Sequence, residues 1–195
     1  MTSPRVVLAS ASPRRRALLA RICPDFTVTP STIDERVPSM PPPEAAVHLA
    51  QAKAWAVAVS VPDALVLGAD TIVVIDGEIL GKPASPAHAA TMLRRLRGRS
   101  HEVITGVAVV RARDRREVTA AVVTRVTMGE YSDLDIDRYV ATGEPLDKAG
   151  AYAVQERGAA LVARVDGCYT NVVGLPVSTT RGLLAALHST GAASG

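Results

Sequence analysis

The chain has 195 residues, of which 48% are hydrophobic and 21% charged, and its formal net charge is +3. This length and hydrophobic content suffice for a core of ordinary size, so we expect one domain over residues 1–195 and exclude a fibre or a structureless tail. Aromatic residues make up only 3% of the chain, which disfavours binding of single-stranded nucleic acid by base stacking.

The N-terminal part alternates short apolar runs with helical patterns. The run 6–9 predicts a buried strand, 14–21 a helix and 26–29 a second strand. The proline-rich stretch 36–43 predicts a stiff exposed loop, because proline is excluded from helix interiors and central strands. A helix is expected to follow over residues 44–59.

The rest of the chain predicts a mixture of strands and helices. In order we expect strand segments over 64–67 and 71–75, a hairpin turn at 76–77, a helix over 87–96, strands over 101–110 and 118–128, a helix over 134–141, an irregular stretch after Pro145, a strand over 160–165, a glycine- and asparagine-containing segment over 167–174 and a helix over 179–188. This alternation lacks strict βαβ regularity, so it predicts an α/β domain around a mixed sheet.

A membrane role and a cysteine-based metal site are both disfavoured. The longest apolar stretch, 54–67, is interrupted by polar residues and a proline and is too short to cross a bilayer. Cys23 and Cys168 lie far apart without metal-ligand spacing. We therefore expect a cytoplasmic protein with reduced thiols.

Two groups of carboxylates are candidates for chemistry. Asp70 follows the strand segment 64–67 and Gly68-Ala69, and side chains that emerge at a strand end lie where open α/β sheets bind ligands. Asp34-Glu35 lies just before the proline-rich loop, and Mg²⁺ takes oxygen ligands of this kind. Taken singly, each group fits an ordinary turn or loop role equally well.

The basic residues show an imbalance, because only three of the 22 are lysines, namely Lys53, Lys82 and Lys148. Together they are candidates for sites that need a compact ammonium rather than a guanidinium. Lys82 lies in GEILGKP, residues 77–83, which lacks the spacing of a phosphate-binding loop, and a solvated turn lysine is the simpler interpretation of that stretch alone. The basic tip RARDRR, residues 111–116, is interpreted as a solvated hairpin end.

Several motifs occur in order from Leu8 to about Leu187, and together they resemble the Maf family of nucleoside triphosphate pyrophosphatases. They are SxSPRRxxLL over 10–19, Asp34-Glu35, QxKA over 51–54, GADT over 68–71, GKP over 81–83, SHxVxTG over 100–106, DKAGAYxxQ over 147–155 and NVVGLP over 171–176. The segment DKAGAYxxQ resembles the branch of the family that acts on dTTP and UTP.

The resemblance implies a homodimer with a mixed central β-sheet flanked by helices and a cleft, related to inosine triphosphate pyrophosphatases. It implies hydrolysis of dTTP and UTP, or of modified pyrimidine nucleotides, to the nucleoside monophosphate and pyrophosphate. It also implies a divalent cation, Mg²⁺, Mn²⁺ or Co²⁺, and a house-cleaning role in nucleotide metabolism.

The resemblance also implies roles for individual residues. Asp70 is the expected proton acceptor and, with Glu35, the expected metal ligand. Arg14, Thr71 and Gln155 are expected to govern substrate choice. The chain departs from the family at Glu156, where glycine is usual after that glutamine.

The chemistry of a triphosphate is consistent with these assignments. About four negative charges enter one site, which therefore needs cations, a metal and a carboxylate. Arg14, Lys53 and Lys82 can supply the cations, and Ser10 with the helix start near Pro13 can donate further hydrogen bonds to phosphate. Arg15 and Arg16 could serve packing or the surface instead.

Two alternatives remain open from the sequence. The first is a nucleotide-sensing regulatory protein of septum formation and cell division that binds triphosphates without turnover. The second is a nucleic-acid binder that uses residues 14–16 and the basic tip, which salt-dependent binding of duplex without nucleotide hydrolysis would favour.

Overall fold

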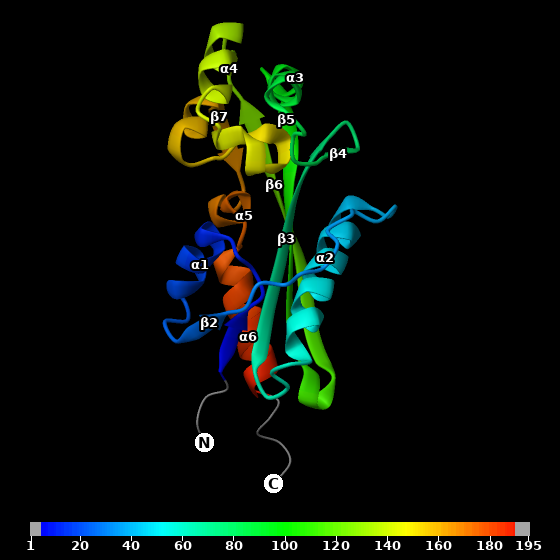
Figure 1. The fold of residues 1–195 in the computed structure, drawn as a ribbon. Helices are drawn as coiled ribbons and strands as arrows, with labels where there is room; N and C mark the ends of the chain where they lie inside the picture. The colour runs from blue at the N-terminus through cyan, green and yellow to red at the C-terminus, as the bar shows by residue number, and fades with distance from the viewer. Residues whose placement is uncertain (1–4, 190–195) are drawn as a thin grey trace. The chain divides into compact units, whose positions relative to one another are not determined.

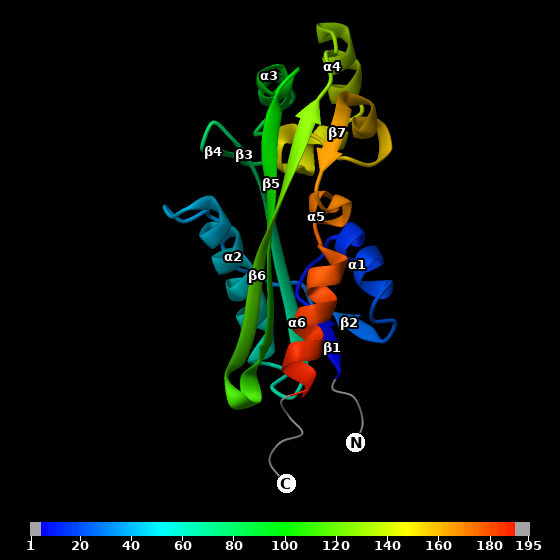
Figure 2. The same ribbon diagram turned by 180° about the vertical axis from the view of Figure 1, so that it is seen from behind.

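The computed structural model describes residues 5–189, and the chain divides into two compact units (Figure 1 and Figure 2). The first unit takes in the chain up to Asp70, residues 105–122 and the chain from Gly174 onwards, while the second takes in residues 71–104 and 123–173. Three strands, β3 (Leu65–Ile75), β5 (Ser100–Arg111) and β6 (Arg116–Met128), continue from one unit into the other. A single domain over residues 1–195 stays a prediction.

The first unit is built on parallel strand pairs. Its further elements are β1 (Val6–Leu8), α1 (Pro13–Ala20), β2 (Phe26–Val28), α2 (Pro42–Ala58), the 3-10 turn η1 (Ala112–Asp114) and α6 (Val177–Ser189). Strand β1 pairs in parallel with β2 and β3, so that Val7 stands opposite both Thr27 and Val66. In both views α2 lies on one side of these strands, and α1 and α6 lie on the other (Figure 1 and Figure 2).

The second unit has its own apolar core and antiparallel pairs. Its further elements are β4 (Glu78–Leu80), α3 (Pro86–Leu96), α4 (Asp133–Val140), β7 (Val162–Asp166), α5 (Tyr169–Val173) and the 3-10 turns η2 (Glu144–Asp147), η3 (Ala149–Ala151) and η4 (Glu156–Leu161). Strand β4 pairs antiparallel with β3, and β7 with β6. Leu93, Leu96 and Ile136 are among the fully buried residues of its core.

The sheet is mixed, as the sequence predicts, and its strands are hydrogen-bonded in the order β2-β1-β3-β5-β6-β7, with β4 beside β3. Helix starts follow local chemistry, since α1 and α3 each have a serine cap followed by proline, and α4 begins with a reciprocal capping box between Ser132 and Asp135. Among the described residues, no helix is both long and apolar enough to cross a membrane.

The structure corrects two sequence predictions. Residues 68–70 do not interrupt two strand segments, because β3 is continuous. The strand expected over 160–165 begins at Val162, since the preceding residues form η4. Helix α5 lies in the segment 167–174, for which the sequence indicated neither a helix nor a strand. At the basic tip, Arg111 pairs with Asp114 and Arg113 with Asp63, so its charges are partly neutralised within the unit.

Gly68 is present for close approach, not for a turn. A Cβ atom there would lie 2.1 Å from the Ala50 carbonyl oxygen and 2.9 Å from the Ala54 nitrogen. The backbone of α2 therefore lies directly against β3. Asp70 consequently lies within a strand that faces this helix, rather than at a strand end as the sequence suggested.

We expect Gly68→Ala to lower the free energy of unfolding by about 3 kcal/mol or more, because the added methyl group meets main-chain atoms that cannot rotate away. Urea unfolding monitored by circular dichroism measures this change. The matched control is Gly182→Ala in α6, where a Cβ meets nothing within 4 Å, and helix propensity should raise stability by about 1 kcal/mol. A Gly68→Ala variant as stable as the wild type would contradict this close contact.

Candidate active site

A buried lysine joins two carboxylates in the first unit. Lys53 projects from α2, and its Nζ lies 2.6 Å from Oδ1 of Asp70 on β3. The same Nζ lies 2.7 Å from Oε1 of Glu35, in the loop before α2. Lys53 and Asp70 are buried, whereas about half of the Glu35 side chain, 50%, is exposed. The structure thus brings three predicted site residues together, with Glu35 on the solvent side.

The local sequence explains how Lys53 reaches Asp70. Helix α2 presents small residues toward the strands, among them the fully buried Ala50 and Ala54. Because Gly68 has no side chain, this face of the helix meets β3 at backbone distance. Lys53, next to Ala54, therefore needs no long reach to its partner. A buried charge is retained only where it is paired and hydrogen-bonded, and this arrangement satisfies that condition.

Arg15 belongs to the same group of charges. Its Nε donates to the Gly174 carbonyl oxygen at 2.9 Å, and its Nη1 lies 3.4 Å from Ser10 Oγ. Burial lowers the pKa of Arg15, while the negative charges of Asp70 and Glu35 act in the opposite direction. Arg15 thus supplies a second fixed positive charge near the two carboxylates.

From the sequence, Arg14 is the expected substrate-binding arginine, whereas Arg15 could serve packing or the surface. Arg14 is half-buried and Arg16 is exposed. Successive residues on a helix point about 100° apart, so the choice between adjacent arginines depends on how α1 is oriented. The only local signal is the Ser12 cap, whose Oγ accepts from the Arg15 backbone nitrogen at 3.3 Å and fixes the start of the helix.

The carboxylates fit a divalent metal only in part. Among residues 5–189, no cluster of three or more His, Cys, Asp or Glu side chains is placed to hold a metal. Asp70 and Glu35 contact the same ammonium, so their oxygens lie close together. Mg²⁺ is commonly held by one or two carboxylates together with substrate phosphates and water, and this pair is suited to that mode.

The other predicted residues lie in the second unit. Lys82 is exposed in the loop after β4, and the carbonyl oxygen of its neighbour Gly81 accepts from the Gly150 nitrogen at 3.1 Å. The Lys82 loop is therefore tied to the segment 147–155 that carries Gln155. Gln155 is half-buried immediately before η4. Thr71, also half-buried, follows Asp70 directly along β3.

The backbone conformation at Glu156 favours glycine. Glu156 has a φ of +59°, in the left-handed region that glycine adopts without strain. A side chain in this conformation costs about 1 kcal/mol relative to ordinary backbone. Glycine therefore suits this position better, and the present chain carries some strain immediately after Gln155.

A buried histidine lies beside the same segment. His101 Nε2 lies 2.7 Å from the Tyr152 hydroxyl, and the two rings meet edge to face with centroids 5.3 Å apart. Burial lowers the pKa of His101 from its ordinary value of 6.5 to about 4. His101 is therefore neutral near pH 7 and serves the structure there as a hydrogen-bonding group.

This burial makes stability depend on pH. Below pH 6.5 His101 is protonated in the unfolded chain, but in the folded protein it stays neutral until about pH 4. The free energy of unfolding therefore decreases as the pH is lowered from 6.5 to about 4. We expect the protonation of His101 to lower the free energy of unfolding by about 3 kcal/mol over this pH range. Unfolding titrations at several pH values measure this loss as the difference in pH dependence between wild type and His101→Leu. His48→Gln, which changes an exposed histidine, is the control and should keep the wild-type slope. Equal slopes for His101→Leu and wild type would contradict the assignment.

The mixed sheet and its flanking helices make this an α/β protein. Its candidate site is the pair of ion pairs that Lys53 on α2 makes with Asp70 on β3 and with Glu35. A family model described as "Maf-like protein" matches residues 5–187. A dTTP/UTP pyrophosphatase of Moorella thermoacetica is 58% identical over 182 residues, covering 93% of this chain and 94% of its own. One of Pelotomaculum thermopropionicum is 50% identical over 180 residues, covering 92% and 94%. The chain therefore belongs to the Maf family.

A solved structure supports the fold class. The Ham1 protein of Staphylococcus aureus matches with a TM-score of 0.53 and 16% identity, over 94% of this chain and 99% of that protein. At this identity the likeness concerns the fold alone. The predicted mixed sheet flanked by helices is confirmed.

Proposed function

We propose that this protein hydrolyses dTTP and UTP, or modified pyrimidine nucleoside triphosphates, to the nucleoside monophosphate and pyrophosphate. The observation that carries the proposal is the buried Lys53 bound to both Asp70 and Glu35 in a chain of the Maf family. The names of the two relatives, both dTTP/UTP pyrophosphatases, support the substrate class. We expect a homodimer from the same family membership, which light scattering of the purified protein can measure.

The charges of the first unit suit the reaction. Lys53 and Arg15 oppose the negative charge of a bound triphosphate, and Ser10 can donate through its hydroxyl. Asp70, held by the Lys53 ammonium, is the group that accepts the proton of the attacking water. The water oxygen bonds to the α phosphorus, the bond from that phosphorus to the bridging oxygen breaks, and pyrophosphate leaves with the bond electrons.

The metal has a place in this proposal. Asp70 and Glu35 would hold a divalent cation, Mg²⁺, Mn²⁺ or Co²⁺, which when bound neutralises charge on the phosphates. Lys53 keeps the two carboxylates close despite their mutual repulsion. We expect Lys82 of the second unit to contact phosphate. Arg14 of the first unit and Thr71 of the second are expected to take part in substrate choice.

Gln155 is the expected reader of the base. Uracil and thymine present a carbonyl acceptor beside an N–H donor, and a primary amide pairs with both, while cytosine reverses the pattern. We expect Gln155→Ala to lower kcat/KM for UTP and dTTP and to flatten the preference over CTP, because a fixed amide leaves an unpaired polar group with the wrong base. Competition assays with mixed nucleotides measure the ratio. A variant with the wild-type UTP-to-CTP ratio would remove Gln155 from base recognition.

The proposal is tested by incubating purified protein with a nucleotide panel and Mg²⁺, Mn²⁺ or Co²⁺ and identifying the products by phosphorus NMR. The expected result is monophosphate and pyrophosphate from UTP and dTTP, with CTP, ATP and GTP much slower. Nucleoside diphosphate with inorganic phosphate would overturn the assigned bond cleavage. Tight binding of triphosphates without turnover would instead favour the nucleotide-sensing regulator.

A further inference from the structure

The segment that carries Gln155 is held from both sides by one pair of side chains. The Tyr139 hydroxyl, on α4, accepts a hydrogen bond from the Ala153 nitrogen at 3.3 Å. It donates to Glu144 Oε1 at 2.9 Å. The same carboxylate oxygen accepts from the Gly158 nitrogen at 3.1 Å. Tyr139 and Glu144, which we call the Tyr139–Glu144 bracket, therefore bind the backbone two residues before Gln155 and three residues after it.

The chain passes directly against the hydroxyl of this bracket. A Cβ atom at Gly158 would lie 2.6 Å from the Tyr139 hydroxyl oxygen and 2.3 Å from the Ala153 carbonyl oxygen. Only glycine fits between them. The two ends of the segment are thus brought together over a single hydroxyl group, and Gln155 lies at the turn between them.

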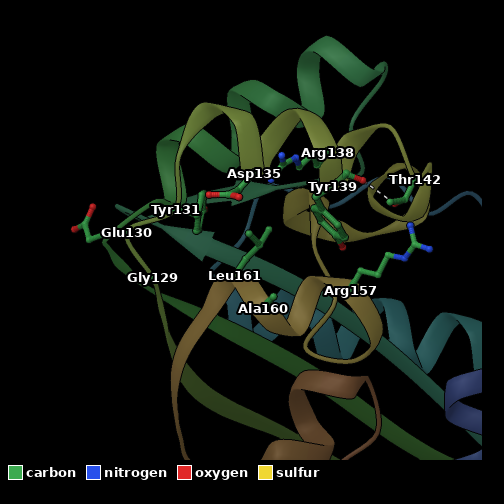
Figure 3. A pocket seen from close by; sticks show the side chains of 10 residues that line it. All are labelled: Gly129, Glu130, Tyr131, Asp135, Arg138, Tyr139, Thr142, Arg157, Ala160 and Leu161. Atoms are coloured by element: carbon green, nitrogen blue, oxygen red, sulfur yellow. Dashed lines mark hydrogen bonds between the residues drawn. The ribbon is translucent and has the colours of Figure 1, made fainter.

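Packing and hydrogen bonds both hold Tyr139, which is buried in the apolar core of the second unit. Tyr139 lines a pocket of about 530 Å³, and Figure 3 shows it beside Thr142 and Arg157. Burial and the Glu144 carboxylate both raise the pKa of Tyr139, so the hydroxyl keeps its proton and donates it to the carboxylate. A hydrogen bond to a charged acceptor is stronger than one between neutral groups.

Base selection requires the Gln155 amide to keep one orientation. A primary amide that rotates by 180° exchanges its donor and acceptor, and it then accepts cytosine as readily as uracil. The backbone dihedral angles of a residue limit the rotamers that its side chain can adopt. Fixing the backbone on both sides of Gln155 therefore fixes the place from which its amide meets the base, and an amide displaced from that place loses the hydrogen bonds that distinguish uracil from cytosine.

We propose that Tyr139 and Glu144 are positioning residues for base selection, because they fix the backbone around Gln155 and thereby the place from which its amide reaches the base. This inference rests on the proposed function, in which Gln155 reads the pyrimidine. The bracket acts through Gln155 and has no part in the phosphate chemistry, which is assigned to other residues.

The test compares Tyr139→Phe with Tyr131→Phe. Tyr139→Phe removes the hydroxyl and keeps the ring, so we expect the UTP-to-CTP ratio of kcat/KM to fall on the order of tenfold, with a smaller change in kcat for UTP. Hydrogen exchange at the Ala153 and Gly158 amides should become faster. Tyr131→Phe also removes a buried hydroxyl of the same unit, which donates to the Leu93 carbonyl oxygen at 2.8 Å. This control should keep the wild-type UTP-to-CTP ratio and the wild-type exchange rates of the Ala153 and Gly158 amides.

Variants of Glu144 provide an independent test of the bracket, which remains available if Tyr139→Phe fails to fold. Glu144→Gln keeps an acceptor oxygen for both hydrogen bonds and should retain the wild-type ratio, whereas Glu144→Ala should lower it and speed the same amide exchange. Wild-type ratio and exchange in Tyr139→Phe or in Glu144→Ala would overturn the bracket and leave the proposed function standing. A wild-type protein with no preference for UTP over CTP would overturn the proposed function, and the selective role of the bracket with it.

Discussion

Asp70→Asn is expected to lose activity by about a hundredfold or more while the protein remains folded. Asparagine keeps the volume of the side chain and one oxygen for the Lys53 ammonium, which lies 2.6 Å away in the wild type. It cannot take up the proton of the attacking water, and it lacks the negative charge that would hold a metal. Steady-state release of pyrophosphate from UTP measures the loss, and circular dichroism reports the fold.

A surface carboxylate of the same unit provides the control for Asp70→Asn. Asp63 pairs with Arg113 at 3.3 Å, and both side chains are exposed, so Asp63→Asn should leave turnover unchanged. Glu35→Gln should resemble Asp70→Asn, because Glu35 shares the same ammonium. A folded Asp70→Asn protein with normal turnover would exclude Asp70 as the proton acceptor.

Lys53→Met is expected to produce a loss of similar size for a different reason. The change leaves two neighbouring carboxylates without the positive charge between them, and it removes a cation that opposes the charge of the triphosphate. We therefore expect weaker apparent binding of UTP as well as slower turnover. Initial-rate kinetics over a range of UTP concentrations separate the two effects.

Lys53→Arg should recover little of this activity. The buried position beside the backbone of β3 suits a compact ammonium, and the guanidinium is planar and larger. Urea unfolding of both variants shows whether the loss is catalytic or structural. Near-normal kinetics in folded Lys53→Met would mean that the lysine has only a structural role.

Much of the fold could be predicted because its signals are local. Serine and proline mark the starts of α1 and α3, and the Asp76-Gly77 turn joins β3 to β4, as expected from the sequence. Gly68 was misinterpreted because a glycine in a strand indicates either a break or a close approach. Only the position of α2, a separate element, decides between them.

The candidate site was predictable as a set of residues but not as an arrangement. Asp70, Glu35 and Lys53 were each chosen for a separate reason, and nothing in their spacing states that one ammonium binds both carboxylates. Arg15 was left open because its role depends on the rotation of α1. The Tyr139–Glu144 bracket joins residues from α4, η2 and the chain around Gln155, contacts that no local pattern reveals.

The contact of α2 with glycines reverses the usual mutational behaviour of a protein core. Gly106 on β5 repeats the arrangement of Gly68, since a Cβ there would lie 2.2 Å from the Ala46 carbonyl oxygen. In most cores the damaging change removes a methyl group, but here the damaging change adds one. The glycines that face α2 beside Lys53 therefore cannot be replaced by larger residues without moving the helix. Substitutions of the charged groups can therefore keep the fold, whereas enlarging Gly68 or Gly106 would push α2 away from the strands and displace Lys53 from Asp70.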